Sequence, residues 1–555
     1  MSARIEMQTV YGISDGGGPP TLESQLETHR IKSRPPRGEV DPHRYTVITD
    51  TEELKNFSED AAHVRGSTSE AIRLKPEAGE AEVAYILKRS PSVLTQGARS
   101  SLTGGATPEG SIVIDMSYQD KILEIGEDSV TVQPGVTVHA LQENLAEKEL
   151  YYPPGPTFDG ANVGGIIATN AAGAATFKYG QTRPWVEELT VILANGEVVD
   201  MKRGQYRAHK DGYFEWENAD GKIQRIPIPT YIMPDVPKIS AGYYAKPDMD
   251  FIDLFIGSEG TLGVITKAKL RIVPKPHISW AIVSCQSEDQ ALELTRRLRD
   301  QSLETRKTGD PSGIDASAIE YIDEHAVEVL REDSTTREAI TPPEEAKTLL
   351  LIQLENIRTD SDLPLERFAV ILDDMGLSNN TQIAFPSNGD KIKYFKDIRE
   401  AVPSGVNGRV GQNKKNIDSR ISKMAGDMIV PFERLGEMLQ IFREKFAAYG
   451  LEYYNWGHFS DGNTHPNVVA KSYGEILAAK QAILEIGREV IKLGGSPLAE
   501  HGVGKNPIKQ QLLEELYGKE GIEQMRAVKE ALDPEWKLAP GNLFLKAPSA
   551  GIEPT

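Results

Sequence analysis

The sequence predicts an α+β fold built from two successive α+β units, and three observations support this. Segments rich in Gly, Ser and Thr at 97–106, 153–179 and 257–266 each lie beside strand-like apolar runs. From residue 278 onward, strand-like and helix-like runs alternate as in helices packed on one antiparallel sheet. The chain has 555 residues, enough for several units of about 150 residues. The Pro-rich segment 274–276 is the predicted boundary between the two.

Residues 1–60 are polar and rich in Pro and Gly, so we predict an N-terminal arm rather than a domain. The first unit then covers 61–276. Its predicted helices are 80–89 and one that begins after the N-cap candidate Thr137. Its predicted strands are 93–96, 112–116, 122–125, 130–133, 189–193, 198–201 and 264–273.

The second unit covers residues 277–494. Its predicted strands are 280–284, 349–354, 427–430 and 453–458. Its predicted helices are 289–299, 365–375, 432–449 and 475–493. Residues 495–555 contain the segment AEHGVGKNP and a mainly helical tail.

Composition narrows the class of partner. The chain carries 62 Lys and Arg against 82 Asp and Glu, a net charge of −20, which argues against nucleic acid or an anionic membrane surface as the main partner. A single cysteine, Cys285, excludes an internal disulfide framework and a CxxC site. No apolar run approaches the roughly 18 residues of a spanning helix. We therefore expect a soluble, cytoplasmic protein, with peripheral attachment to a membrane as an alternative.

The segment 153–179 is almost devoid of large side chains between residues 160 and 175. It cannot build a core of its own, so it must let something approach its backbone closely. A phosphate-bearing cofactor is the favoured ligand, and the three small-residue segments together can line one groove of backbone N–H donors. For any one segment alone, a flexible loop is the alternative. No GxGxxG and no GxxxxGK[ST] occurs, so ordinary Rossmann and Walker phosphate loops lack support.

Five ordered motifs resemble one protein family. GARSSLTGGA, PPGPTFDGANVGGIIATNAAG and GSEGTLGVIT are similar, in this order, to the FAD-binding domain of the vanillyl-alcohol oxidase type. GHFSDGNTH and AEHGVG resemble the branch that contains D-lactate, glycolate and D-2-hydroxyglutarate dehydrogenases. The resemblance implies a two-part FAD-binding domain over 61–276 and an α+β cap (substrate) domain with an antiparallel sheet over 277–494. It also implies that the helical segment 495–555 returns to the FAD-binding domain.

The resemblance further implies which residues bind FAD. The three loops contain no His or Cys, the residues that anchor covalent flavin in such proteins, so we expect noncovalent FAD. The implied cofactor-binding residues are Gly97, Ala98, Arg99, Ser100, Ser101, Gly104, Pro154, Gly155, Thr157, Gly164, Gly165, Thr169, Asn170, Glu259, Gly263 and Ile265.

GHFSDGNTH places His458 and His465 on either side of a predicted turn, a spacing that can bring two imidazoles to one side of a hairpin. Glu500 would complete a third arm. Two His and one carboxylate with an open position are the ligands expected of a catalytic Zn²⁺ or Mn²⁺. From the spacing alone, ordinary polar surface or core histidines are the alternative, and the resemblance favours the metal.

The resemblance assigns roles to three further residues. His501 matches the active-site base, and an ordinary imidazole pKa of about 6.5 suits proton removal at neutral pH; a packing histidine is the alternative. Arg399 and Lys423 match positions that hold the substrate carboxylate. Because the similarity is loose there, other cations are alternatives, namely Arg409, Lys414, Lys415 and Arg420.

The function implied is FAD-dependent oxidation of a D-2-hydroxy acid to the 2-oxo acid, by hydride transfer to flavin N5 with help from the metal and His501. The implied partners are a small 2-hydroxy acid and an electron acceptor (a quinone, a cytochrome, an electron-transfer flavoprotein or oxygen), and a homodimer is compatible with them. One alternative is a transferase resembling alkylglycerone-phosphate synthase, which lacks the histidine pair. Another is a noncatalytic FAD-binding subunit of an electron-transfer complex, which should have lost the metal ligands or the base. A phenol oxidase of the same fold would use tyrosines and covalent flavin.

Overall fold

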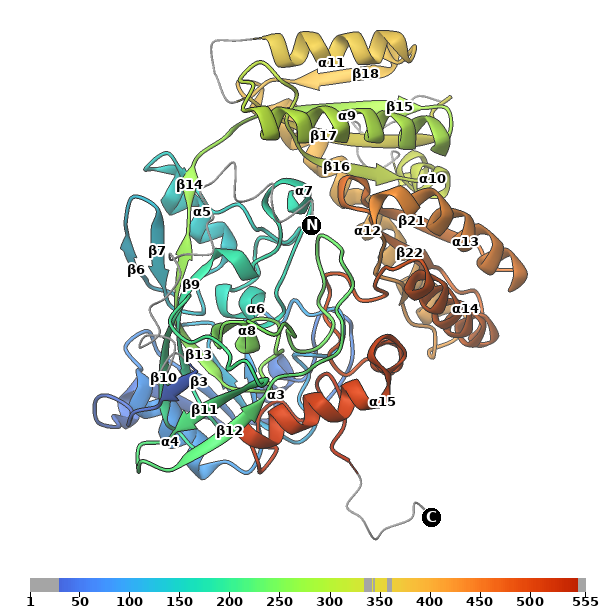
Figure 1. Cartoon of the computed structure of the whole chain (residues 1–555). Helices are drawn as coiled ribbons and strands as arrows, with labels where there is room; N and C mark the ends of the chain where they lie inside the picture. Colours follow the sequence, from blue (N-terminus) through green and yellow to red (C-terminus); the bar gives the residue numbers. More distant parts are fainter. Residues whose placement is uncertain (1–28, 334–341, 343–344, 357–361, 548–555) are drawn as a thin grey trace.

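The computed structural model describes residues 29–333, 342, 345–356 and 362–547 (Figure 1). We call residues 29–276 the first unit, 277–494 the second unit and 495–547 the C-terminal segment. In Figure 1 the first unit, blue to green, forms the lower left body, and the second unit, yellow-green to dark orange, lies above it and to its right. Among the helices of the described ranges, none combines the length and apolar character needed to cross a membrane.

Two sheets frame the first unit. One has the strand order β2-β3-β5-β4 and the other β10-β9-β13-β7-β6. Their strands are β2 (Tyr45–Ile48), β3 (Ala71–Leu74), β4 (Val93–Gln96), β5 (Ile112–Asp115), β6 (Ile122–Ile125), β7 (Ser129–Val132), β9 (Val186–Ile192), β10 (Val198–Lys202) and β13 (Val264–Arg271). The β6–β7 and β9–β10 pairs are antiparallel, so these consecutive predicted strands form two hairpins.

The helices of the first unit begin where the sequence places them. Helix α4 (Glu80–Arg89) has the predicted bounds. Helix α5 (Val138–Ala146) begins after Thr137, whose side chain accepts a hydrogen bond from the Ala140 backbone N–H, and this confirms the N-cap. Three short helices follow, namely α6 (Val163–Ala168), α7 (Thr176–Tyr179) and α8 (Ile252–Phe255). The first two lie within the small-residue segment 153–179, so that segment is ordered.

The described part of the predicted N-terminal arm belongs to the first unit. Strand β1 (Arg30–Lys32) pairs in parallel with β11 (Tyr213–Glu217), which also pairs with β12 (Ile223–Pro227). Strand β2 pairs with β3. The prediction of a separate arm over 1–60 is therefore wrong for residues 30–48, because strands this short carry no period that a sequence can reveal. Residues 1–28 lie outside the described residues.

One antiparallel sheet organises the second unit, as predicted. Its order is β18-β15-β17-β16-β21-β22-β19, and β20 also pairs with β22. The strands are β15 (His277–Cys285), β16 (Ala316–Ile322), β17 (Thr348–Asn356), β18 (Thr381–Ala384), β19 (Met424–Ala425), β20 (Met428–Ile429), β21 (Tyr453–His458) and β22 (Asn463–Val468). The helices are α9 (Glu288–Thr308), α10 (Glu324–Asp333), α11 (Leu363–Asp374), α12 (Gly389–Asn416), α13 (Leu435–Ala448) and α14 (Tyr473–Lys492).

Several elements of the second unit have no clear signal in the sequence. Strand β16 is buried at every position, so it lacks the polar alternation of a half-buried strand. Helix α12 contains Pro403 and several glycines, and these residues are unfavourable in helix interiors. Tertiary packing, through buried residues such as Phe395, Val402 and Val406, stabilises α12 instead.

Helix α7 of the first unit inserts into the second unit. Lys178 forms ion pairs with Asp315 before β16 and with Glu355 of β17, the latter at 2.5 Å. The Tyr179 hydroxyl donates to the same Glu355 carboxylate at 2.7 Å, and Arg306 of α9 lies 2.8 Å from Asp315. All five side chains are buried or nearly so. The two positive charges, on Lys178 and Arg306, therefore balance the two negative charges, on Asp315 and Glu355, at the junction between the units.

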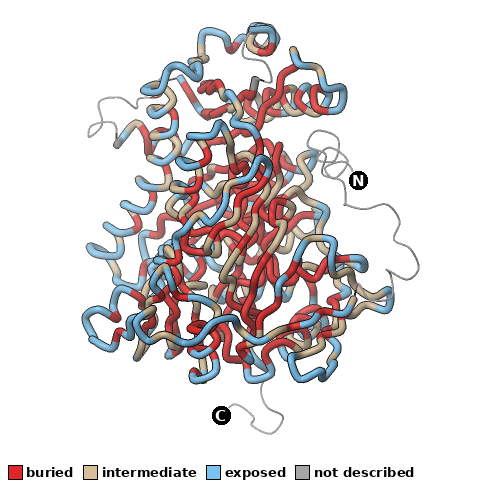
Figure 2. Tube along the Cα trace, turned by 90° about the vertical axis from the view of Figure 1, so that its left-hand side faces the viewer, coloured by how far each residue is buried: buried red, intermediate tan, exposed pale blue. Residues whose placement is uncertain are grey.

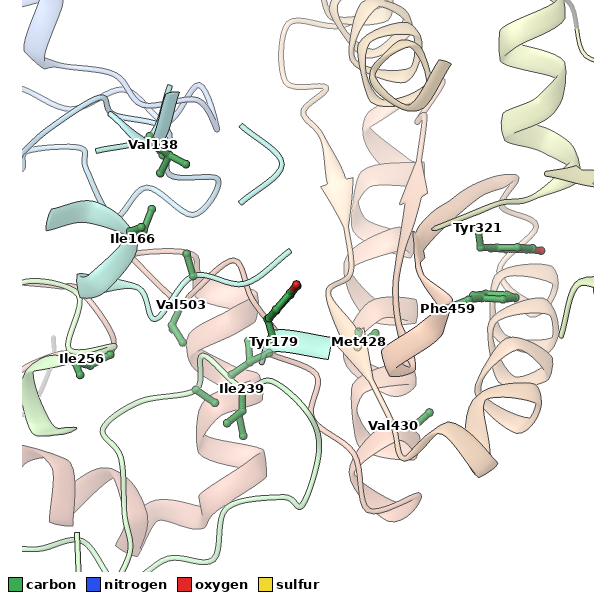
Figure 3. Packing of buried hydrophobic residues seen from close by; sticks show 14 of the residues in the cluster. Val138, Ile166, Tyr179, Ile239, Ile256, Tyr321, Met428, Val430, Phe459 and Val503 are labelled. Atoms are coloured by element: carbon green, nitrogen blue, oxygen red, sulfur yellow. The ribbon is translucent and has the colours of Figure 1, made fainter. Parts of the chain in front are cut away.

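Apolar packing continues across the two units. A single cluster of buried apolar residues includes Ile166 of α6, Val503 of the C-terminal segment and Met428 of β20 (Figure 3). Figure 2 shows buried residues running through the interior of both bodies. The C-terminal helix α15 (Pro507–Leu532) contacts β12, and the chain then returns beside β4, where the Ala539 N–H donates to the Val93 carbonyl at 2.7 Å.

Candidate active site

Each of the three small-residue loops holds one residue other than glycine in the left-handed conformation. These are Arg99 (φ 55°), Asn170 (φ 50°) and Glu259 (φ 51°). Such a conformation costs on the order of 1–3 kcal/mol and tends to occur at ligand-binding sites, where the surroundings enforce it. All three loops that the sequence singles out thus contain such a residue, although five described residues elsewhere, such as His63 and Leu543, adopt the same conformation.

The first loop presents backbone donors that have no protein partner. Among the described residues, the N–H groups of Ala98, Arg99, Ser100, Ser101 and Leu102 make no hydrogen bond to the protein. Four of these residues are only partly exposed, and Leu102 is exposed. Consecutive backbone N–H groups around a left-handed residue form a concave anion site. The loop therefore fits a phosphate group.

Glycines in the second loop serve two purposes. A Cβ on Gly164 would lie 2.7 Å from Pro134 Cβ, and one on Gly173 would lie 2.2 Å from the Gly155 carbonyl oxygen. A Cβ on Gly165 would meet nothing within 4 Å, and this residue is exposed. Neither Gly164 nor Gly165 has a positive φ, so the space around each residue, and not its backbone conformation, explains the glycine. Gly164 permits close packing, whereas Gly165 leaves open space beside the loop.

Other predicted cofactor residues have partners inside the protein. The Asn170 side chain accepts from the Arg183 backbone and donates to the Ile239 carbonyl. Thr169 Oγ1 donates to the Gly165 carbonyl. Two predicted residues pack beside β9, because a Cβ on Gly263 would lie 2.3 Å from Val191 and Ile265 pairs with Val191.

Glu259 of the third loop binds the AEHGVG segment. Its two carboxylate oxygens accept hydrogen bonds from the backbone N–H groups of Val503 and Gly504, each at 2.7 Å. Burial raises the pKa of Glu259 to about 7, even though these N–H groups oppose the rise. Glu259 thus joins the third loop to the segment that carries Glu500 and His501.

The histidines of GHFSDGNTH converge with Glu500. His458 Nε2 lies 3.1 Å and His465 Nε2 lies 3.3 Å from the same Glu500 oxygen, Oε1. The ligand atoms of the three residues all lie within 4.8 Å of one another. The turn that brings β21 and β22 together ends at Gly462, whose φ is 82° and whose Cβ would lie 2.3 Å from the Val430 carbonyl oxygen. The sequence motif and the geometry therefore indicate the same cluster.

A carboxylate lies near the outer ring nitrogen of each histidine, but it forms a hydrogen bond only with that of His458. Glu320 of β16 hydrogen-bonds His458 Nδ1, and although burial opposes a charge on the ring, Glu320 raises the pKa of His458 to about 9. Asp427 lies 3.6 Å from His465 Nδ1. Metal-binding histidines commonly have a carboxylate on the other ring nitrogen. The donor set and its surroundings therefore fit a divalent cation.

A buried lysine that the sequence does not point to completes this cluster. Lys238 has no exposed side-chain surface, and its Nζ lies 2.7 Å from Glu500 Oε2 and 3.1 Å from Asp461 Oδ2. It lies in the chain between β12 and α8, far from both motifs. The two oxygens of Glu500 thus have different partners, because Oε1 faces the histidines and Oε2 faces the ammonium.

His501 lies against the cluster in a neutral state. Its ring stacks on His465, with centroids 4.7 Å apart, and its Nε2 lies 3.5 Å from Glu500 Oε1. Its Nδ1 lies 3.6 Å from Asp427 Oδ2. Burial lowers the pKa of His501 to about 3 and outweighs the nearby Asp427 carboxylate, so this imidazole is uncharged at neutral pH. It is a weaker base than the ordinary imidazole assumed from the sequence.

Of the candidate anion-binding cations, Arg399 contacts this site directly. Its Nε donates to Glu320 at 2.7 Å and its Nη2 donates to Thr157 Oγ1 at 2.9 Å. Lys423 is exposed, but the protein around its ammonium lowers the pKa to about 8, and it lies 6.0 Å from the Trp456 ring.

The other cations have surface surroundings. Arg409 pairs with Glu332 and Arg420 pairs with Asp418. Lys414 and Lys415 are exposed near the end of α12.

Comparison with known proteins gives matches over most of the chain. Residues 75–202 match the family described as FAD binding domain, and residues 275–543 match the C-terminal domain of FAD linked oxidases. Glycolate oxidase subunit GlcD of Bacillus subtilis is 29% identical, over 82% of this chain and 84% of that protein. D-lactate dehydrogenase of Archaeoglobus fulgidus is 27% identical, over 86% and 91%. Mitochondrial D-2-hydroxyglutarate dehydrogenase of Bos taurus is 27% identical, over 89% and 80%.

Two solved structures share the fold. Alkyldihydroxyacetonephosphate synthase has a TM-score of 0.58 at 14% identity and covers 97% of this chain and 92% of its own. 4-Ethylphenol oxidase from Gulosibacter chungangensis has a TM-score of 0.60 at 15% identity and covers 90% and 94%. With the antiparallel sheet of the second unit, these matches confirm the predicted fold class.

Proposed function

The chain belongs to the FAD-linked oxidases, and from this premise we propose that it oxidises a D-2-hydroxy acid to the 2-oxo acid, using noncovalent FAD and a divalent cation, Zn²⁺ or Mn²⁺. One observation carries the proposal. His458, His465 and Glu500 converge, and a neutral His501 lies beside them. The names of three relatives, which refer to glycolate, D-lactate and D-2-hydroxyglutarate, support a 2-hydroxy acid as the substrate class.

The residues present suit both cofactors. The unpartnered N–H groups of the first loop and the open space at Gly165 suit the pyrophosphate and the backbone approach of FAD. Two imidazoles and one carboxylate suit Zn²⁺ or Mn²⁺. Bound FAD would accept the hydride, and the cation would act as a Lewis acid that lowers the pKa of the substrate hydroxyl.

His501 is the proposed base. Its Nδ1 faces Asp427, so an Nδ1–H tautomer leaves Nε2 free to accept a proton. Nε2 lies 3.5 Å from the Glu500 oxygen that faces the histidines, close to where a chelated hydroxyl would lie. Because the ring is uncharged at neutral pH, it begins in the form that accepts the hydroxyl proton.

Arg399 is the proposed carboxylate-binding residue, and Lys423 is a second cation for the same group. Arg399 uses two N–H groups for Glu320 and Thr157. A guanidinium has five N–H donors, so others are left for a substrate carboxylate. Thr157 belongs to the second loop, so Arg399 would hold the substrate between that loop and the histidine cluster.

Anaerobic flavin bleaching tests this function. The purified flavoprotein would be mixed with D- and L-lactate, glycolate, and D- and L-2-hydroxyglutarate, before and after metal removal by a chelator. We expect a D-2-hydroxy acid or glycolate to bleach the flavin only when Zn²⁺ or Mn²⁺ is present. A matched control is His325→Ala, because His325 is an exposed residue of the second unit outside the cluster.

Two results would contradict the proposal. One is that none of these acids bleaches the metal-loaded protein. The other is that metal analysis finds no ion and added Zn²⁺ or Mn²⁺ neither binds nor changes turnover. The second result would favour a transferase or a noncatalytic FAD-binding subunit.

A further inference from the structure

We propose that Glu320 is a positioning residue that fixes the metal ligand His458 and the anion-binding Arg399 in one geometry. The inference rests on the proposed function, since it concerns the same site. It adds a residue that no sequence motif contains and assigns it a specific task. The Glu320 carboxylate binds both His458, which would hold the cation, and Arg399, which would hold the substrate carboxylate. The positions of these two side chains therefore depend on each other.

Strand pairing places Glu320 beside His458. In the antiparallel ladder between β16 and β21, Glu320 is directly opposite His458, and Tyr321 is opposite Gly457. Residues directly opposite each other in such a ladder project to the same face of the sheet. Both side chains are buried, with 7% and 3% of their surface exposed. Backbone register, rather than a flexible loop, therefore sets the distance between the carboxylate and the ring.

The two carboxylate oxygens have separate tasks. Oε1 hydrogen-bonds His458 Nδ1, and Oε2 accepts from Arg399 Nε at 2.7 Å. An acceptor at Nδ1 keeps a proton on that nitrogen, so the lone pair for a cation must come from Nε2. Nε2 is the atom that lies 3.1 Å from Glu500 Oε1. Glu320 thus selects the ring nitrogen that faces the other ligands.

The same carboxylate determines where Arg399 points. With Nε held by Glu320, the guanidinium reaches Thr157 Oγ1 of the second loop at 2.9 Å. Arg399 lies in α12, and without a partner its long side chain could adopt several rotamers. The hydrogen bond to Glu320 selects one of them. A 2-hydroxy acid held by the cation and by Arg399 would be fixed at two points that both depend on Glu320. Such fixing is how positioning lowers a reaction barrier.

The decisive variant is Glu320→Gln. Glutamine has nearly the same shape but only one acceptor oxygen, and its NH₂ group would face a donor. It can therefore satisfy His458 or Arg399, but not both. Glu320→Asp tests charge alone, because aspartate keeps the negative charge but is one methylene shorter. Glu324→Gln is the matched control, since Glu324 is an exposed residue four positions along the chain that pairs with Lys347.

Each variant would be prepared with FAD bound and metal removed. Mn²⁺ binding would be followed by the loss of the free-ion electron paramagnetic resonance signal. KM and kcat for the bleaching acid would then be measured at saturating Mn²⁺. For Glu320→Gln we expect Mn²⁺ binding to be about 10–100-fold weaker, with a KM raised about 10-fold or more. Glu320→Asp should not restore either value. Arg399→Gln should raise KM but leave Mn²⁺ affinity within about threefold, and Glu324→Gln should change neither.

Three outcomes would overturn the inference. Wild-type Mn²⁺ affinity in Glu320→Gln would remove the link to His458. An unchanged KM in that variant would remove the link to Arg399. Restoration of both values by Glu320→Asp would mean that charge suffices, and this variant decides the matter alone if Glu320→Gln does not fold. A wild-type protein that binds no Mn²⁺ or Zn²⁺ would instead reject the proposed function itself.

Discussion

Replacing Glu259 by Gln is expected to change how stability depends on pH. Burial raises the pKa of Glu259 from its ordinary 4.5 to about 7. The folded protein therefore binds this proton more tightly than the unfolded chain does. The contribution to stability is complete below about pH 4.5 and is lost as the pH rises to about 7. Glutamine does not ionise, so the variant lacks this loss.

The structure sets the magnitude. A pKa difference of about 2.5 corresponds to about 3 kcal/mol of unfolding free energy, at about 1.4 kcal/mol for each pKa unit. Unfolding of 555 residues carries an entropy of about 1.2 kcal/mol/K, at about 2.1 cal/mol/K per residue. Glu259 alone should then lower the wild-type Tm by about 3 °C across this pH range. In Glu259→Gln, the amide NH₂ would face one of the backbone N–H groups of Val503 and Gly504, at a cost of about 1–3 kcal/mol at every pH.

Calorimetry of the flavin-loaded protein between pH 5 and pH 8 measures this. At pH 5, Glu259→Gln should melt about 1–3 °C below the wild type. At pH 8 the difference should vanish or reverse, because the wild type then bears the cost of a buried charge. Glu324→Gln, an exposed control, should follow the wild type throughout. A constant difference between Glu259→Gln and the wild type over this range would refute the reasoning.

Three further outcomes are expected. Gly165→Val should lose FAD but keep the Tm of the flavin-free wild type, because its side chain enters open space beside the loop without a clash inside the protein. Gly164→Val should lower the Tm of the flavin-free protein as well, through its clash with Pro134. Flavin titration and calorimetry of the flavin-free proteins separate the two variants, and stoichiometric flavin in Gly165→Val would reject the groove. His458→Ala should lose metal but keep FAD, whereas His501→Ala should keep both and reduce flavin at least ~100-fold more slowly. Metal analysis and stopped-flow measurement of flavin bleaching check these two expectations. A wild-type rate of flavin reduction in His501→Ala would mean that another residue is the base. Acid precipitation should release the flavin into solution, and colour in the pellet would indicate a covalent link.

The sequence predicts elements well where local signals agree. The bounds of α4 and β21, and the N-cap Thr137 of α5, follow from apolar period, capping and turn residues within a few positions of one another. It does not predict β16, which is buried on both faces, or the pairing of β1 with β11. These depend on partners far away in the chain, which no local window contains.

The candidate site divides in the same way. His458, His465 and Glu500 lie in motifs whose residue types already indicate metal chemistry, and the structure brings them together. Glu320 and Lys238 are single charged residues in ordinary surroundings, separated by 138 and 262 positions from the partners they bind. Only the completed fold shows that a carboxylate and an ammonium lie against the cluster.

The insertion of α7 limits how this architecture can be recombined. Lys178 and Tyr179 belong to the first unit in sequence, yet they share Asp315 and Glu355 with the second unit. A chimaera that joins this first unit to a second unit without carboxylates at the positions of Asp315 and Glu355 would leave Lys178 buried without its partners, and breaking a buried ion pair in this way costs about 3–5 kcal/mol. Grafts should therefore carry residues 176–179 together with the second unit. For exchange of the two units, the boundary that keeps these contacts together therefore includes the four-residue helix α7 and not only the Pro-rich connection at 274–276.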